Sequence, residues 1–324
     1  MENVEGIIRY LAVFALLWLG EWLYFKLAHR FRIIDKPNER SSHTRVTLRG
    51  GGIVFYWGML LCALFFGCPY PWFFAGLTLI CFISFMDDVH SVPSKVRIVF
   101  HFSAMLLMFY EWGLFHHFPW WYILVALIFC TGILNAYNFM DGINGITGGY
   151  SLVAVATLLY VNLHGEAFVD DSILWVAFLS LYVFNWFNFR TRARCFAGDV
   201  GSVGIAFILL FALGRLVLAD GSLYWIILLA VYGVDSIWTI VHRLMLHENI
   251  FLPHRKHAYQ IMANELHIPH VRVSLFYMAL QLLVDIGALS VPSAYRWPYF
   301  GAVILLLTAA YVWFMRKYFP KAAK

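Results

Sequence analysis

Long apolar runs dominate this chain and restrict it to one class of fold. Hydrophobic residues make up 62% of the 324 positions and charged residues only 13%, about half the share found in a soluble domain. Several runs are long enough for a helix to cross the hydrocarbon core of a bilayer. We therefore predict an all-α, polytopic membrane helix bundle that forms a single domain over residues 1–324.

Eleven apolar segments are expected to be membrane helices, with ten as the alternative. Their approximate bounds are 7–28, 51–67, 70–86, 97–113, 119–135, 146–163, 172–189, 201–219, 222–240, 271–290 and 297–315. The first segment is too long for the core of a signal peptide and has no basic leader, so we expect a retained helix.

Lysine and arginine residues are concentrated in alternate connections between these segments. Twenty of the 23 lie on one side of the predicted membrane, and only Arg9, Arg215 and Arg296 lie elsewhere. Basic connections stay in the cytoplasm, which predicts an external N-terminus and a cytoplasmic C-terminus. The longer connections with polar motifs lie on the cytoplasmic side, so we expect the functional site on that face of the inner membrane.

The first cytoplasmic connection, residues 35–52, combines basic and hydroxyl residues with three glycines at the start of a helix. Glycine allows a ligand to approach the backbone, and a helix N-terminus favours anions, so this pattern indicates a phosphate site. A basic loop held near anionic lipid headgroups is the alternative, but it leaves the glycines and hydroxyls unexplained. The candidate ligands are Lys36, Arg40, Ser42, His43, Arg49 and Gly50.

Two adjacent carboxylates, Asp87 and Asp88, follow the third apolar segment, and Lys95 precedes the fourth. Adjacent carboxylates repel each other, so ionisation of both requires a cation such as Mg²⁺ or a lysine. Helix capping is the simpler interpretation of an isolated aspartate pair. Neighbouring side chains on a helix point about 100° apart, so we expect Asp87 to face a lipid phosphate and Asp88 to position a cation.

Amide and acidic side chains recur in the segment NAYNFMDGIN, residues 135–144. Asn135, Asn138 and Asp141 are spaced three apart, so they would share one face of a helix, and Asn144 would extend the row. Oxygen ligands of this kind suit Mg²⁺. Amide bonding between helices could explain one asparagine but explains the set poorly.

Asp199 lies among glycines in FAGDVGS, residues 196–202, where another helix is expected to begin. A carboxylate in this setting suits a metal held beside a phosphate. Capping would explain the aspartate, but it would not explain the preceding arginines, which include Arg194.

The last long connection contains PHRKH, residues 253–257. Its candidate ligands are His254, Arg255 and His257, which suit a pyrophosphate. A zinc site is excluded because neither the spacing nor the ligand types fit one. The remaining histidines of this half of the chain are expected at the surface: His242, His247, His267 and His270.

The order and content of these motifs resemble the polyprenyl-phosphate N-acetylhexosamine-1-phosphate transferase family of membrane enzymes (glycosyltransferase family 4). The resemblance extends from about Asp35 to Gln260 and rests on DKPNERSSHTRVTLRGGG, FMDDVHSV, NAYNFMDGINGITGG, FAGDVGS and PHRKHAYQ. It implies a cytoplasmic cleft in which a sugar phosphate, first of all GlcNAc-1-phosphate, passes from a UDP-sugar to undecaprenyl phosphate. UMP is released, and the product starts a cell-surface glycan such as O-antigen or capsule.

The resemblance also implies roles for the candidate residues. Asp199 and Asn138 would hold Mg²⁺, for which Mn²⁺ can substitute, and Asp87, Asp88 and Asp141 would be catalytic. The other candidates would bind substrate: Lys36, Arg40, Ser42, His43, Arg49, Gly50, Lys95, Asn135, Asn144, Arg194, His254, Arg255 and His257.

Two departures from the family pattern narrow these expectations. Relatives often have an aspartate where this chain has Asn144, so no metal or base role is carried over to that position. PHRKH differs from the triple histidine of the branch that transfers phospho-N-acetylmuramoyl-pentapeptide, which makes that branch the alternative. A transporter or lipid flippase is the alternative from another class, although the acids cluster at one membrane face and transport sites usually lie near mid-bilayer. A homodimer is left open.

Overall fold

A computed structural model describes residues 2–37, 42–43, 45–250 and 254–322. This part of the chain is almost entirely helical, which confirms the predicted class. The α-helices are α1 Glu2–Phe31, α2 Ile53–Phe66, α3 Pro71–Val89, α4 Ser94–Glu111, α5 Leu114–His117, α6 Trp120–Met140, α7 Ile146–His164, α8 Asp171–Asn188, α9 Gly198–Asp220, α10 Ala230–Met245, α11 Ala258–Gln260, α12 His270–Ser290 and α13 Arg296–Ala322. The shorter elements are β1 Ile34–Asp35, β2 Thr47–Leu48, η1 Leu223–Leu229, η2 Ile261–Glu265 and η3 Ser293–Tyr295.

Every predicted membrane segment coincides with helical structure, but the count of eleven spans is not confirmed. Within the described residues, eight helical stretches are long and apolar enough to cross a membrane. The other three predicted segments correspond to α2, α4 and α8. Helix α2 has only 14 residues, and α4 carries charged residues at both of its ends.

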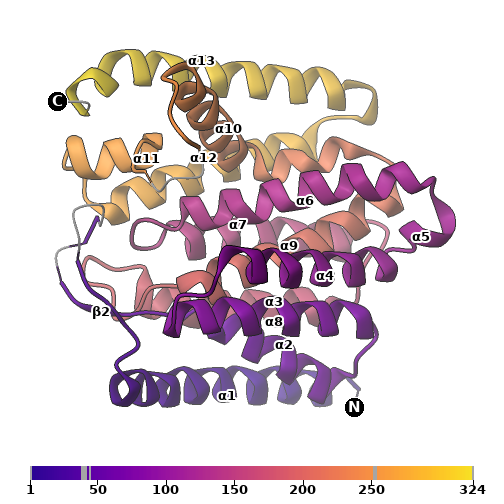
Figure 1. The fold of residues 1–324 in the computed structure, drawn as a ribbon. Coiled ribbons are helices and arrows are strands. Elements are labelled where there is room, and N and C mark those ends of the chain that lie inside the picture. Colours follow the sequence, from indigo (N-terminus) through magenta and orange to yellow (C-terminus); the bar gives the residue numbers. More distant parts are fainter. Residues whose placement is uncertain (1, 38–41, 44, 251–253, 323–324) are drawn as a thin grey trace.

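Helix α9 lies inside the bundle and packs against α2, α3, α6 and α7 (Figure 1). Every residue from Val200 to Leu213 is buried, as expected for a helix that is apolar on all sides. Figure 1 shows β2, α11 and the C-terminus at one end of the bundle and the N-terminus at the other. We call the end that carries β1, β2 and α11 the loop end.

The first loop is bonded to the start of α9 at the loop end. Strand β1 pairs with β2 in antiparallel orientation, and Leu48 of β2 also forms a bridge with Cys195. The N–H groups of Gly51 and Gly52 donate to the carbonyls of Phe196 and Ala197, at 2.9 and 3.0 Å. A Cβ atom on Gly52 would lie only 2.2 Å from the Cα of Gly201, so this glycine allows α2 and α9 to touch.

A break in the helical backbone separates η1 from α10, which crosses the neighbouring helices at a steep angle in Figure 1. Gln281 of α12 bonds to both sides of the break: its Oε1 accepts from the N–H of Val231 at 3.1 Å, and its Nε2 donates to the carbonyl of Ile227 at 3.0 Å. The buried backbone groups freed by the break therefore have partners, as a membrane interior requires.

Candidate active site

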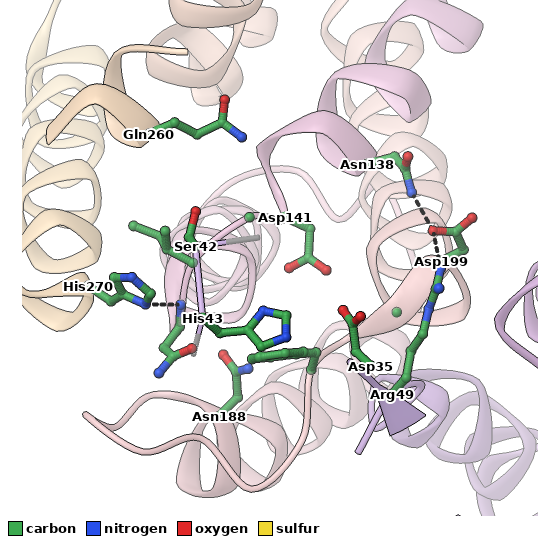
Figure 2. Close-up of a pocket in the computed structure, with 15 residues that line it drawn as sticks. Asp35, Ser42, His43, Arg49, Asn138, Asp141, Asn188, Asp199, Gln260 and His270 are labelled. Carbon is green, nitrogen blue, oxygen red and sulfur yellow. Dashed lines mark hydrogen bonds and ion pairs between the residues drawn. The ribbon is translucent and has the colours of Figure 1, made fainter. Parts of the chain in front are cut away.

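A cavity of about 310 Å³ lies at the loop end, where segments far apart in sequence converge. Figure 2 shows side chains from the first loop, the α6–α7 connection, the start of α9 and the region of α11 around it. The cavity is lined by Asp35, Ser42, His43, Arg49, Asn138, Asp141, Gly142, Ile143, Asn144, Asn188, Phe196, Gly198, Asp199, Gln260 and His270. Four of the five sequence motifs therefore contribute directly to one site.

The fifth motif, the aspartate pair, does not line the cavity, but Asp88 bonds to two residues that do. The Asp88 carboxylate accepts the backbone N–H groups of Asp199 at 2.9 Å and Val200 at 3.0 Å, and thus caps α9 from another helix. It also accepts from Nε of Arg49 at 2.6 Å. A Cβ on Gly198 would lie 2.5 Å from Asp88 Oδ2, so the glycine gives the carboxylate access to this helix end.

Asp87 points away from Asp88, as expected for neighbouring residues on a helix. Its partner is a cation, Arg97, whereas the sequence predicts that it faces a lipid phosphate. It accepts from Nη1 of Arg97 at 2.8 Å and from the N–H of Val92 at 2.7 Å. Arg97 also approaches Asp199, with Nη2 3.4 Å from Oδ2, while Nη2 of Arg49 lies 3.5 Å from Oδ1. Asp199 is therefore flanked by the two arginines that the aspartate pair holds in place.

Asn138 and Asp199 meet in the cavity, as predicted. Asn138 Nδ2 donates to Asp199 Oδ1 at 3.0 Å and also lies 3.2 Å from the Ser202 hydroxyl oxygen. Figure 2 shows Asp35 and Asp141 pointing into the space beside this pair. Among the charged lining residues there are thus three carboxylates and one arginine, Arg49.

Asp141 follows α6 directly, and its backbone N–H bonds back to the carbonyl of Asn138. Burial, together with the negative charges of Asp199 and Asp88, raises the pKa of Asp141 to about 7, although Arg49 lowers it. A carboxyl group of this kind gains or loses its proton near neutral pH and is stabilised as a carboxylate by any cation that enters the cavity.

The lining fits a Mg²⁺ ion that shares its coordination with substrate. The oxygens of Asp199, Asn138 and Asp141 are hard ligands that face one cavity. No cluster of three or more acidic, histidine or cysteine side chains in the described part of the chain forms a closed metal site. Mg²⁺ usually takes one or two protein carboxylates and completes its shell with phosphate and water.

Asn138, Asp141 and Asp199 all fall in one stretch of the chain that matches a known protein family. Residues 70–216 match the sequence profile of glycosyl transferase family 4. The match includes Asp87, Asp88, Asn138, Asp141 and Asp199, and it confirms the family resemblance predicted from the motifs.

Curated relatives support the same family. The undecaprenyl-phosphate alpha-N-acetylglucosaminyl 1-phosphate transferase of Yersinia pestis is 30% identical over 169 residues, 47% of this chain and 46% of the relative. The protein of that name from Salmonella typhi is 28% identical over 177 residues, 49% of this chain and 47% of the relative. A probable enzyme of this kind from Bacillus subtilis is 24% identical over 181 residues, half of each chain. The chain spans about half the length of the curated relatives it matches.

Several predicted substrate ligands do not line the cavity, both within residues 70–216 and outside them. Gly50 is buried next to the Tyr24 hydroxyl, with φ at +78°. Asn135 is exposed, and its amide donates to the carbonyl of Thr131 in the same helix at 2.9 Å, so it does not join Asn138 in the cavity. The exposed cationic candidates away from the lining are Lys36, Lys95, Arg194 and Arg255. Arg40 lies outside the described residues.

Asn144 lines the cavity but is also bonded to the surrounding backbone. Its side-chain amide donates to the carbonyls of Arg190 at 2.9 Å and Thr191 at 3.4 Å. Its backbone carbonyl accepts from the Ser274 hydroxyl at 2.8 Å. These contacts connect the α6–α7 connection with the loop before α9 and with α12.

The connection that carries His254 and His257 does not contribute either histidine to the cavity lining. His257 is 1% exposed, and its Nδ1 lies 3.3 Å from Oδ1 of Asp235. Burial, together with the neighbouring His257 and Arg243, lowers the pKa of His254 to about 3. His254 is therefore neutral at physiological pH, so any contact it makes with a phosphate is not that of a cation.

The sequence interpretation missed some of the lining residues. Asp35 and Asn188 had no assigned role, and His270 was expected at the surface, which was wrong because it lines the cavity. Asn188 accepts from the N–H of Gly145 at 2.7 Å and donates to the carbonyl of Cys195 at 2.8 Å. Asp35 could have been found as the first residue of the first motif, but no local pattern distinguishes Asn188 or His270.

Proposed function

We propose that this protein transfers an N-acetylhexosamine-1-phosphate, first of all GlcNAc-1-phosphate, from a UDP-sugar to undecaprenyl phosphate and releases UMP. The central observation is a cavity at one end of a membrane bundle in which Asp141, Asn138 and Asp199 face one another beside Arg49. The names of the relatives supply the substrate class. The product would initiate a surface glycan, for example in lipopolysaccharide biosynthesis.

The chemistry is a substitution at phosphorus. A phosphate monoester has a second pKa of about 6, so the lipid phosphate is mostly dianionic at neutral pH and is already a nucleophile. Its oxygen attacks the β-phosphorus of the UDP-sugar, the bond from that phosphorus to the bridging oxygen breaks, and UMP leaves with the electron pair. Arg49 faces the cavity and can stabilise the charge on the leaving group.

We assign Asp199 and Asn138 to Mg²⁺ binding, with Mn²⁺ as a substitute, and place Asp141 beside them. The ion supplies neutralisation of the pyrophosphate and of the departing UMP. The acidic lining supports this assignment, because three carboxylates would otherwise repel a phosphate-rich substrate. Asp88 and Asp87 act through Arg49 and Arg97, which border Asp199.

We further infer that the loop end faces the cytoplasm and that the protein resides in the inner membrane. The basic residues of the connections support this orientation, since they collect on the side that carries the motifs. UDP-sugars are water-soluble and would reach the cavity from that side, while the lipid phosphate would reach it from the bilayer.

Release of UMP tests this function. The full chain, purified in detergent, is incubated with undecaprenyl phosphate, Mg²⁺ and one UDP-sugar from a panel that includes the N-acetylhexosamines and UDP-N-acetylmuramoyl-pentapeptide. We expect UMP and a lipid-linked sugar only when both substrates are present. UMP release with the pentapeptide donor alone would assign the protein to that branch. Lipid or sugar transport in liposomes without UMP would contradict the proposal.

A further inference from the structure

A buried carboxylate in the membrane part of α10 connects that helix with the loop end. Asp235 is 3% exposed, and donors from three segments surround it. Its Oδ1 accepts from the backbone N–H of Ala258 at 3.0 Å and from the Thr239 hydroxyl at 3.1 Å. Its Oδ2 accepts from the Tyr277 hydroxyl at 2.7 Å. One side chain thus holds α10, α11 and α12 together.

The fourth partner of Asp235 leads to the cavity. Nδ1 of His257 lies 3.3 Å from Asp235 Oδ1, which leaves Nε2 buried and without a partner among the described residues. The backbone N–H of His257 donates to Oε1 of Gln260 at 3.2 Å, and Gln260 lines the cavity (Figure 2). Two contacts therefore connect Asp235 with Gln260, a residue of the cavity lining.

The α11 segment is also held against the motif that carries Asp141. The Tyr259 hydroxyl donates to the carbonyl of Phe139 at 2.8 Å, and a Cβ on Gly142 would lie 2.2 Å from that hydroxyl oxygen. The position of α11 therefore bears on two parts of the cavity wall, Gln260 and the segment that carries Asp141.

We propose that Asp235 is a positioning residue for the transfer reaction: it fixes His257 and Gln260 in the orientation that binds the nucleotide-sugar. This inference rests on the proposed function. Charged groups in membrane segments are costly, and those that persist usually serve a site. A purely structural anchor is the competing interpretation, and Asp285 supplies an internal comparison. Asp285 is equally buried and accepts from Thr157 at 2.9 Å and Gln281 at 2.6 Å. Neither aspartate lines the cavity, but Asp235 contacts His257, which bonds to the lining residue Gln260, whereas Asp285 has no such contact among the described residues.

Matched substitutions separate the two interpretations. Asp235→Asn keeps the shape and one acceptor, so the protein should fold, while weaker positioning should raise the KM for the UDP-sugar roughly tenfold and change kcat less. Asp285→Asn should leave the KM unchanged. Equal effects of the two substitutions on KM would overturn the proposal. If Asp235→Asn does not fold, Tyr277→Phe removes one bond to Asp235 and should raise the KM in the same direction by a smaller factor.

A double-mutant cycle tests whether Asp235 acts through His257. In a His257→Asn background, Asp235→Asn should change the KM by less than about twofold, because residues that act as a unit are not additive. Effects that multiply in the double variant would mean that Asp235 acts independently of His257, and the inference would fail.

A labelling experiment keeps the inference separate from the proposed function. Gln260→Cys, made in a Cys68→Ser background because Cys68 is the exposed native thiol, reports the setting of position 260. Adding Asp235→Asn should change the alkylation rate of that thiol several-fold, whereas Asp285→Asn should not. An unchanged rate overturns the inference. A changed rate, combined with no UMP release from the unaltered protein, would instead reject the proposed function and leave the link between Asp235 and position 260 standing.

Discussion

Asp88 lies against the first turn of α9, where its carboxylate accepts the backbone N–H of Asp199 at 2.9 Å. The same carboxylate holds Arg49, whose guanidinium reaches the side chain of Asp199. Both the backbone and the side chain of Asp199 are thereby positioned by one residue from α3. Asp88 thus bonds to the start of a helix other than its own and to an arginine that borders Asp199.

Asp88→Ala should destabilise the protein by about 2–4 kcal/mol, because it removes a buried ion-pair partner and leaves two backbone donors unpaired. Asp87→Ala should cost about half as much, since that side chain makes one backbone bond and a more exposed ion pair. Thermal unfolding in detergent measures both. Equal losses would show that Asp88 is no more of an anchor than its neighbour.

Asp199→Ala should reduce kcat by about 100-fold or more while the protein still folds and inserts, because the backbone cap from Asp88 does not need the Asp199 side chain. Activity is measured as UMP release at saturating Mg²⁺. The matched control is Asp220→Asn at the other end of α9, where the side chain pairs with Arg296. Activity like that of the unaltered protein in Asp199→Ala would end the metal assignment.

Asp87→Asn should reduce activity by the same factor from about pH 6 to about pH 9, because the lipid phosphate is a nucleophile without help from a base. Asp87 is bonded to Arg97 and to the N–H of Val92, which suits a residue that positions a cation. The ratio of the two rate profiles is the measurement. Recovery of the variant at high pH, in step with phosphate ionisation, would instead support general-base catalysis.

The Mg²⁺ concentration for half-maximal activity should fall as the pH rises from about 6 to about 8. The pKa of Asp141 is raised to about 7, so the group is mostly protonated below that pH and becomes an anion that favours a nearby cation above it. The lipid phosphate also titrates, but equally so with an Asp141→Asn enzyme, in which the additional dependence should be absent. Identical Mg²⁺ profiles for the two proteins would exclude Asp141 from the metal's surroundings.

Cys68 should react with a membrane-impermeant maleimide added to the outside of intact cells. It is the exposed native cysteine and lies close in sequence to Tyr70, whose hydroxyl accepts from the N–H of Asp170 at the end away from the cavity. In a Cys68→Ser background, Arg255→Cys beside His257 should react only once the reagent reaches the cytoplasm. The reverse pattern would invert the predicted orientation.

Much of the architecture could be predicted because membrane insertion follows local composition. A run such as 201–219 must be helical in a bilayer whatever its neighbours are, and the structure has α9 there. Whether α2, α4 and α8 cross the membrane depends on the packing around short or charged segments, which local hydropathy does not report. Local hydropathy therefore predicted where the helices lie but not how many of them span the membrane.

The same distinction between local pattern and packing applies to the candidate site. Chemical type and spacing along the chain were sufficient to predict Asp87, Asp88, Asn138, Asp141 and Asp199 as candidates, because carboxylates and amides at the ends of apolar helices are costly unless they serve a purpose. Which of them share a cavity, and which arginine each aspartate contacts, depends on how helices pack. Asn135 shows the limit of spacing: it lies three residues from Asn138, yet it is exposed and bonded within its own helix.

The sequence alone determined that this is a helical membrane protein, that its motifs lie at the ends of the helices, and that the candidate site is built from carboxylates, amides and basic residues. Only the tertiary structure decided that Gly52 mediates contact between α2 and α9, that His270 and Asn188 line the cavity, and that Asp235 lies beneath His257. The physical reason is range. Helix formation and membrane insertion depend on neighbours within a few turns, whereas these contacts join residues separated by tens to more than a hundred positions and exist only after the bundle has packed.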